Sequence, residues 1–218
     1  HLRPIQASFT RLANTFKDLK KYRDLSMGLL AFWIYANGIG TIITMATIYG
    51  KELNFSDITL IGTLLMVQIL AAPFAFLFGW LAKKIGTKKA IYLSLSIYSA
   101  IAIAGYFMYH EWQFWVLGAA VATVQGGSQA LSRSMIGRMM PKSKSAEFYG
   151  FFSVFEKFAS ILGPAIFAVV SRIMNESRLS IASLIVFFLL GIYILTKVNI
   201  ERGVKVALDE EAQLIEAN

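Results

Sequence analysis

The chain has 218 residues, of which 56% are hydrophobic and 16% are charged, with a formal net charge of +8 and no cysteine. This composition excludes an ordinary soluble globular domain, and the lack of cysteine excludes disulfide frameworks and cysteine-ligated metal sites. Several apolar segments reach the roughly 20 residues needed to cross a hydrocarbon core of about 30 Å. The sequence therefore predicts an all-α, polytopic membrane protein.

Residues 1–24 form the first predicted unit, a cytoplasmic segment that precedes the membrane domain. Its basic residues fall between apolar residues that recur at helical spacing, namely Ile5, Phe9, Leu12, Phe16 and Leu19. This pattern is typical of an amphipathic helix on a membrane surface. A solvated linker that folds only against a partner domain fits the same pattern, and the sequence leaves both interpretations open.

Six transmembrane helices are predicted within residues 25–198. Their approximate bounds are 25–50, 59–82, 90–109, 113–140, 148–174 and 179–198. Polar, glycine-bearing stretches are expected to break the first and fourth spans, while the second contains Pro73 and the fifth contains Pro164. We expect residues 199–218 to form a polar cytoplasmic tail that is disordered or loosely helical.

The fourth span contains QGGSQALSRS, residues 125–134, which is unusually polar for a membrane segment. Helical spacing places Gln125, Gln129 and Arg133 on one stripe, which we expect to face a water-filled cavity. A second stripe contains small residues at every fourth position, a pattern that allows close helix packing in lipid: Gly118, Ala122, Gly126, Ala130 and Ser134. The alternative is an ordinary packed span with incidental polar residues.

Orientation follows from the basic residues of alternate connections. Eighteen of the 21 Lys and Arg residues fall on one side of the predicted membrane, and three fall on the other. This bias predicts that both termini are cytoplasmic. The net positive charge therefore marks membrane orientation and does not indicate nucleic-acid binding. We expect an integral, multi-pass protein of a bacterial inner membrane.

The order of span types repeats after three helices. Spans one and four carry glycine-bearing polar stretches, spans two and five each carry a proline, and spans three and six are plain. Because each unit has three spans, the second unit must enter the membrane from the opposite side. This predicts two inverted three-helix repeats, and paired interruptions of this kind point to a transporter's binding site.

Four stretches carry a resemblance to a known family: GTIITMATIYG at 40–50, GWLAKKIGTKK at 79–89, QGGSQALSRS at 125–134 and EKFASILGP at 156–164. The second is similar to the loop between the second and third helices of each half in the major facilitator superfamily. Together they resemble the UMF1 and Atg22-like permeases over about residues 27–198. Those permeases have twelve helices, and the resemblance is to the last six. It implies a gating and loop motif made of Gly79, Lys83, Lys84, Gly86, Lys88 and Lys89, with Arg133 as a gate or anchor.

Two departures from the family pattern limit what the resemblance implies. Lys83 stands where the loop usually has an acidic residue, so a gating salt bridge is not expected there. Ala36, Asn37 and Gly38 stand where relatives often have Asn, Asp and Gly. Because that carboxylate is missing, a proton relay at this position is not expected either.

Glu156 and Lys157 are predicted to lie about 14 Å into the fifth span. Ionisable groups at such depth usually face a cavity or a partner. We expect Lys157 to bind an anionic solute group or a carboxylate of the missing half. The alternative is a lysine that extends to the cytoplasmic headgroups.

Neutral polar side chains complete the predicted solute path. Gln125 is the strongest cavity candidate, with Gln129 one turn away on the same stripe. For Asn37, Thr41 and Gln68, hydrogen bonding to a solute and hydrogen bonding between helices remain equally good interpretations.

An enzyme is not expected, because the spans contain no carboxylate pair, histidine cluster or nucleophile and base pair. We expect no cofactor and no metal. The predicted function is that of the carboxy-terminal half of a secondary transporter for a small organic solute, with amino acids the first choice by resemblance. Its expected partners are the lipid bilayer, the solute, and either a missing amino-terminal six-helix half or a second copy of itself. The alternative is a non-transporting six-helix module that self-associates or scaffolds a partner.

Overall fold

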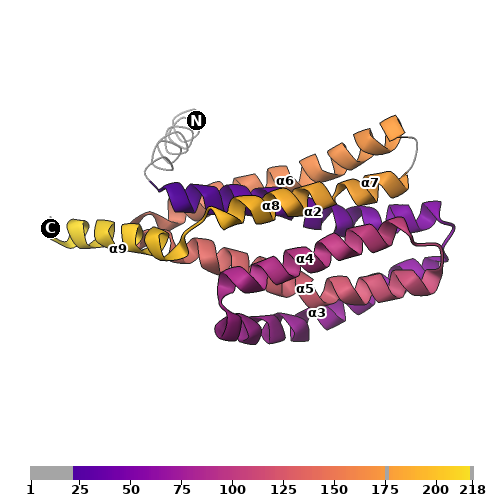
Figure 1. Cartoon of the computed structure of the whole chain (residues 1–218), viewed down its shortest axis with the longest axis horizontal. Helices are drawn as coiled ribbons and strands as arrows, with labels where there is room; N and C mark the ends of the chain where they lie inside the picture. Colours follow the sequence, from indigo (N-terminus) through magenta and orange to yellow (C-terminus); the bar gives the residue numbers. More distant parts are fainter. Residues whose placement is uncertain (1–21, 175–176, 217–218) are drawn as a thin grey trace, which may run out of the picture.

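The computed structural model describes residues 22–174 and 177–216, and these are almost entirely helical (Figure 1). Predictions for residues 1–21 lie outside the described residues. The helices are α2 (Arg23–Glu52), α3 (Asp57–Ile85), α4 (Thr87–Tyr106), α5 (Glu111–Arg138), the short 3-10 helix η1 (Lys142–Lys144), α6 (Ser145–Met174), α7 (Ser177–Ser183), α8 (Ile185–Thr196) and α9 (Ile200–Glu216).

Helices α2 to α6 coincide with the first five predicted spans. Four described stretches are long and apolar enough to cross a membrane: α2, α3, α4 and residues 177–196, which contain α7 and α8. The apolar part of α6 is the shorter stretch Ile161–Ile173, and α5 is less apolar because it contains QGGSQALSRS. The all-helical membrane class is thus supported, whereas the count of six spans stays a prediction.

The expected breaks in the first and fourth spans are wrong, because α2 and α5 run without interruption through residues 36–41 and 125–134. Polar side chains within both stretches donate to backbone carbonyls of the preceding turn, as Asn37 does to Trp33 and Ser132 does to Ser128. These bonds satisfy buried polar groups inside the helix. The glycines cost about 1 kcal/mol each against alanine, which packing can offset.

The sixth predicted span is divided between α7 and α8 at Leu184. Here the backbone N–H of Leu184 donates to Ile181 and that of Phe187 donates to Leu184, so the chain locally makes bonds between residues three apart. The side chain of Leu184 is fully buried. This side chain anchors the tighter turn in the bundle, and the two helices together provide the length of one span.

The helices pack as two groups of three, seen in Figure 1 as α2, α6 and α7–α8 above α3, α4 and α5. Helix α2 contacts α6 and α8, α5 contacts α3 and α4, and α4 joins the groups by contacting α8. At this junction the rings of Tyr98 and Phe188 stack with centroids 5.4 Å apart. The hydroxyl of Tyr35 on α2 donates to Ser132 on α5.

The polar tail is helical. Residues 200–216 form α9, which extends from the bundle at the end where α2 begins (Figure 1). One face of α9 is buried through Gly203, Ala207 and Glu210. Of the two states expected for the tail, the structure shows the helical one, because this face has packing partners that its polar composition did not reveal.

Candidate solute site

A cavity of about 380 Å³ lies between α2, α3, α4 and α5, in the half of the bundle away from α9. Most of its wall is apolar, with Ile42, Val67 and Ala102 as typical members. Leu64 and Gln68 are the exposed lining residues, so the cavity opens beside them on α3. Its size is within the lower range of small-molecule sites.

Gln68 and Gln125, both predicted path residues, line this cavity together. Thr63, which the sequence analysis did not single out, lines it as well and is 3% exposed. The Thr63 hydroxyl and the Gln125 Oε1 atom are buried without a hydrogen-bond partner among the described residues. Because a buried polar atom without a partner is costly, these two atoms are available to a bound polar group or water.

The cavity wall contains no Asp, Glu, Lys, Arg or His among the described residues. The wall also contains Tyr49, whose hydroxyl already donates to the Gly105 carbonyl at 2.8 Å. The wall can therefore offer hydrogen bonds from amides and a hydroxyl but no charge. A charged group on a ligand would therefore need a partner of opposite charge outside this cavity wall.

Close packing of α3 against α5 brings Gln68 and Gln125 to the same cavity. An added Cβ atom at Gly126 would lie 2.8 Å from the Ala75 Cβ atom and 3.0 Å from the Ala71 carbonyl oxygen. Gly118 contacts Thr63 in the same way. These glycines belong to the predicted small-residue stripe, whose close contact with a neighbouring helix is observed, although Ala130 and Ser134 farther along it are exposed.

Asn37 and Thr41 do not reach the cavity. They lie where α2 meets α6, and an added Cβ atom at Gly163 would come within 2.8 Å of the Asn37 carbonyl oxygen. Thr41 donates to that carbonyl at 2.6 Å. The structure therefore places both residues at a tight contact between helices, while Asn37 Oδ1 stays buried without a described partner.

The remaining path candidates do not line the cavity. Gln129 is half-buried one turn beyond Gln125, and Arg133 is exposed a further turn toward the end that carries α9. Lys157 is exposed on α6, and the side chain of Glu156 lies outside what the structure describes. The predicted roles of these four residues stay predictions.

The comparisons with known proteins identify the family. The family described as "Vacuole effluxer Atg22 like" matches residues 2–208. The chain belongs to the Atg22-like family. The resemblance drawn from the sequence is thereby confirmed.

The relatives of this Atg22-like chain include bacterial and fungal proteins. It is 42% identical to "Uncharacterized MFS-type transporter YxiO" of Bacillus subtilis, over 92% of this chain and 47% of that protein. It is 25% identical to "Autophagy-related protein 22-1" of Aspergillus niger, over 93% of this chain and 36% of the relative. It is 26% identical to "Autophagy-related protein 22" of Saccharomyces cerevisiae, over 88% and 39%. The Atg22-like chain thus spans less than half the length of these relatives.

Residues 79–89 of the Atg22-like chain, predicted as a loop, comprise the end of α3, the turn at Gly86 and the start of α4. Gly86 occupies the turn with a φ of +91°, a value that L side chains rarely adopt. Lys83 and Lys89 are exposed, and the Lys84 Nζ atom lies 3.8 Å from the Trp80 ring centroid. Among the described residues, no atom lies within 4 Å of an added Cβ atom at Gly79. Gly86 thus shapes the turn, while the gating role predicted for the loop stays a prediction.

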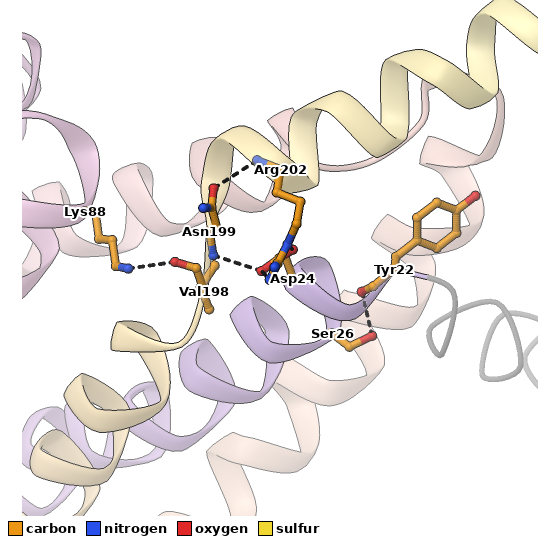
Figure 2. Close-up of polar contacts among 7 residues, drawn as sticks. All are labelled: Tyr22, Asp24, Ser26, Lys88, Val198, Asn199 and Arg202. Carbon is orange, nitrogen blue, oxygen red and sulfur yellow. Dashed lines mark hydrogen bonds and ion pairs between the residues drawn. The ribbon is translucent and has the colours of Figure 1, made fainter.

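Lys88 has a contact that its place in the loop motif did not reveal. Its Nζ atom donates to the Val198 carbonyl at 2.7 Å and to the Thr196 carbonyl at 3.3 Å, as Figure 2 shows for Val198. These carbonyls lie at the end of α8, where helical acceptors lack partners. A positive charge there also complements the helix dipole.

Asp24 and Arg202 are structurally important residues that sequence reasoning missed. Arg202 donates to both carboxylate oxygens of Asp24, which also accepts the backbone N–H of Asn199 (Figure 2). Asp24 is 5% exposed. The carboxylate raises the pKa of the Arg202 guanidinium above its usual value by hydrogen bonding. The available signal was the acidic residue Asp24 immediately before the first predicted span, but its partner Arg202 lay in a segment interpreted as a tail.

Proposed function

We propose that this chain is the carboxy-terminal half of a secondary transporter that moves a small organic solute across a membrane by alternating access. Family membership and the transporter name of the Bacillus subtilis relative support this proposal. The observation that carries it is the cavity in which Gln68 and Gln125 converge between α2 and α5. Amino acids remain the first solute class to test, on the family resemblance.

In this proposal the chain has six spans arranged as two inverted repeats, α2–α4 and α5–α8. The packing supports the repeat, because the first helix of each unit contacts the later helices of the other: α2 contacts α6 and α8, and α5 contacts α3 and α4. Both termini are cytoplasmic, and the membrane is a bacterial inner membrane. Polar groups near the middle of such repeats form the solute site.

The missing partner is an amino-terminal six-helix half, which would pack on α3 and α6. Both helices carry large exposed apolar side chains, including Phe76 (82%), Ile69 (71%) and Ile173 (73%). The same exposed faces favour the second candidate, a non-transporting module that self-associates. We expect the isolated chain to self-associate in mild detergent, and a strictly monomeric species would count against that expectation.

Reconstitution of separate halves tests the transporter proposal. Proteoliposomes containing this chain alone should show no solute flux, and flux should appear when the upstream half of the parent protein is co-expressed with it. Lys157→Met in the parent should abolish flux if the exposed lysine binds an anionic group. Lys205→Met, at an exposed lysine on α9 outside the predicted path and loop motif, is the matched control. Unchanged flux in Lys157→Met would remove Lys157 from the site, and no flux from any combination would favour the module.

A further inference from the structure

The cavity reaches the helix ends on the side of the bundle away from α9, which we name the distal end. Tyr49 lies near the end of α2, Met108 lies in the connection between α4 and α5, and Phe114 lies in the first turn of α5. The connection between α2 and α3 is at the same end (Figure 1). Because all three lining side chains are buried, the cavity is closed here, in contrast to its mouth beside Gln68.

Phe55 covers this closed end. Asn54 has a φ of +60°, the left-handed conformation with which helices commonly end. The backbone N–H groups of Asn54 and Phe55 donate to the carbonyls of Lys51 and Gly50 at 2.9 and 3.0 Å. This turn directs Phe55 back onto the bundle, where it is 7% exposed and packs edge-on against Phe114 with ring centroids 6.0 Å apart. Phe55 therefore adds a second layer of side chains between the cavity and the distal surface.

Glu111, in the first turn of α5, holds the residues that follow Phe55. Its carboxylate accepts the Ser56 backbone N–H at 2.9 Å and the Ser56 hydroxyl at 2.8 Å. It also accepts the hydroxyl of Thr59, in the first turn of α3. The bond from Thr59, followed by those from Ser56, lowers the pKa of the Glu111 carboxyl below its usual value. Hydrogen bonds to a charged acceptor are stronger than neutral ones, so α5 holds the start of α3 firmly.

The contacts of Glu111 are nevertheless able to open. Ser56 is exposed and Glu111 is partly exposed, so water can replace the hydrogen bonds between them. Once they are replaced, the short connection 53–56 can move while α2 and α3 stay helical, as hinged loops do over other binding sites. In the proposed transporter the mouth beside Gln68 lies on α3, which the missing half would cover. The distal end then offers a second route to the cavity.

We propose that residues 53–56 form a gate at the distal end of the cavity, with Phe55 as the side chain that closes it. Glu111 is the positioning residue that keeps the gate shut. When Glu111 releases Ser56 and Thr59, Phe55 moves away from Phe114 and the cavity opens to the distal surface. This inference rests on the proposed function, because a solute must use the cavity, but its test measures access to the cavity and requires no transport.

Modification of a cysteine placed in the cavity tests the gate, because this chain has no cysteine of its own. Thr63→Cys places a thiol in the cavity wall. Ser94→Cys places one at a fully buried position of α4 that does not line the cavity. Each is introduced into the intact parent protein, with any cysteines outside this chain replaced. The protein is held in nanodiscs, so that the small reagent methyl methanethiosulfonate reaches both membrane faces, and the rate of modification is measured.

Changes at the gate should raise the rate at position 63 and leave the rate at position 94 unchanged. Glu111→Ala removes the acceptor of all three hydrogen bonds and should raise the rate at position 63 about tenfold or more. Phe55→Ala should have the same effect. Glu111→Gln keeps one acceptor oxygen and should give an intermediate rate. Glu52→Ala is the matched control, since Glu52 is an exposed acidic residue at the end of α2, and it should change neither rate.

Three results would overturn the proposal. They are an unchanged rate at position 63 in Glu111→Ala, an equal increase in Glu52→Ala, and a rise at positions 63 and 94 together. The last would show that Glu111 supports the whole fold and not a gate. The transporter proposal fails separately, because absence of flux from the combined halves, with opening still observed at position 63, would contradict transport and leave the gate in place.

Discussion

Arg202 on α9 holds Asp24 at the start of α2 through two hydrogen bonds, from Nε to Oδ2 at 2.5 Å and from Nη2 to Oδ1 at 2.8 Å. The two residues are 178 positions apart in the chain. Paired contacts of this geometry fix orientation as well as distance. The pair therefore joins the two ends of the membrane domain.

Removing this pair should destabilise the protein. Asp24→Asn leaves the Arg202 guanidinium without its charged partner and should lower the midpoint of thermal unfolding by about 2–6 °C. Arg202→Gln should have an effect in the same direction. Because both changes remove one interaction, the double variant should lose less than the sum of the single losses. Strictly additive losses in thermal unfolding would show that the two side chains do not interact.

Lys88→Met should also reduce stability, because two carbonyls at the end of α8 lose their donor. The expected loss is about 1 kcal/mol in the free energy of unfolding, measured by titration with a denaturing detergent. Lys89→Met is the matched control, since Lys89 is adjacent and exposed. Equal effects of the two substitutions would contradict the role assigned to Lys88.

Gly126→Val tests the close approach of α5 to α3. The new Cβ atom would press against the backbone carbonyl of Ala71, which cannot move away as a flexible side chain can. We expect a loss of about 1–3 kcal/mol in the free energy of unfolding. Gly150→Val is the control, because no atom of the residues that the structure describes lies within 4 Å of an added Cβ atom there. If both variants unfold alike, packing at Gly126 is not the cause.

Hydropathy and periodicity located α2 to α6 in the sequence, although α5 and the first half of α6 are less apolar than α2, α3 and α4. The same reasoning predicted that the small residues of α5, such as Gly126, pack closely on another helix. It could not identify α3 as that neighbour, because many helix pairings fit one stripe. That pairing of α3 with α5 creates the cavity shared by Gln68 and Gln125 and leaves the Thr63 hydroxyl without a partner among the described residues. Neither feature could be predicted from the sequence.

Two local expectations were incomplete for a common physical reason. The stretch around Asn37 was expected to break its helix, which it does not, and residues 199–218 were expected to be either disordered or loosely helical. In both places polar side chains find partners that composition does not show: Asn37 bonds within its own helix, and Glu210 contacts Tyr22 and Lys144. Helical spacing of Gly203, Ala207 and Glu210 was the signal available for α9.

Solute-dependent thermal stabilisation of the intact parent protein tests the central claim most directly, screened over amino acids, sugars and organic anions. Binding to the folded state raises the unfolding midpoint by mass action. We predict a shift with one solute class that disappears in Gln125→Leu and persists in the control Gln213→Leu, whose site is exposed on α9. A shift that survives Gln125→Leu unchanged would contradict the assignment of the cavity as the solute site.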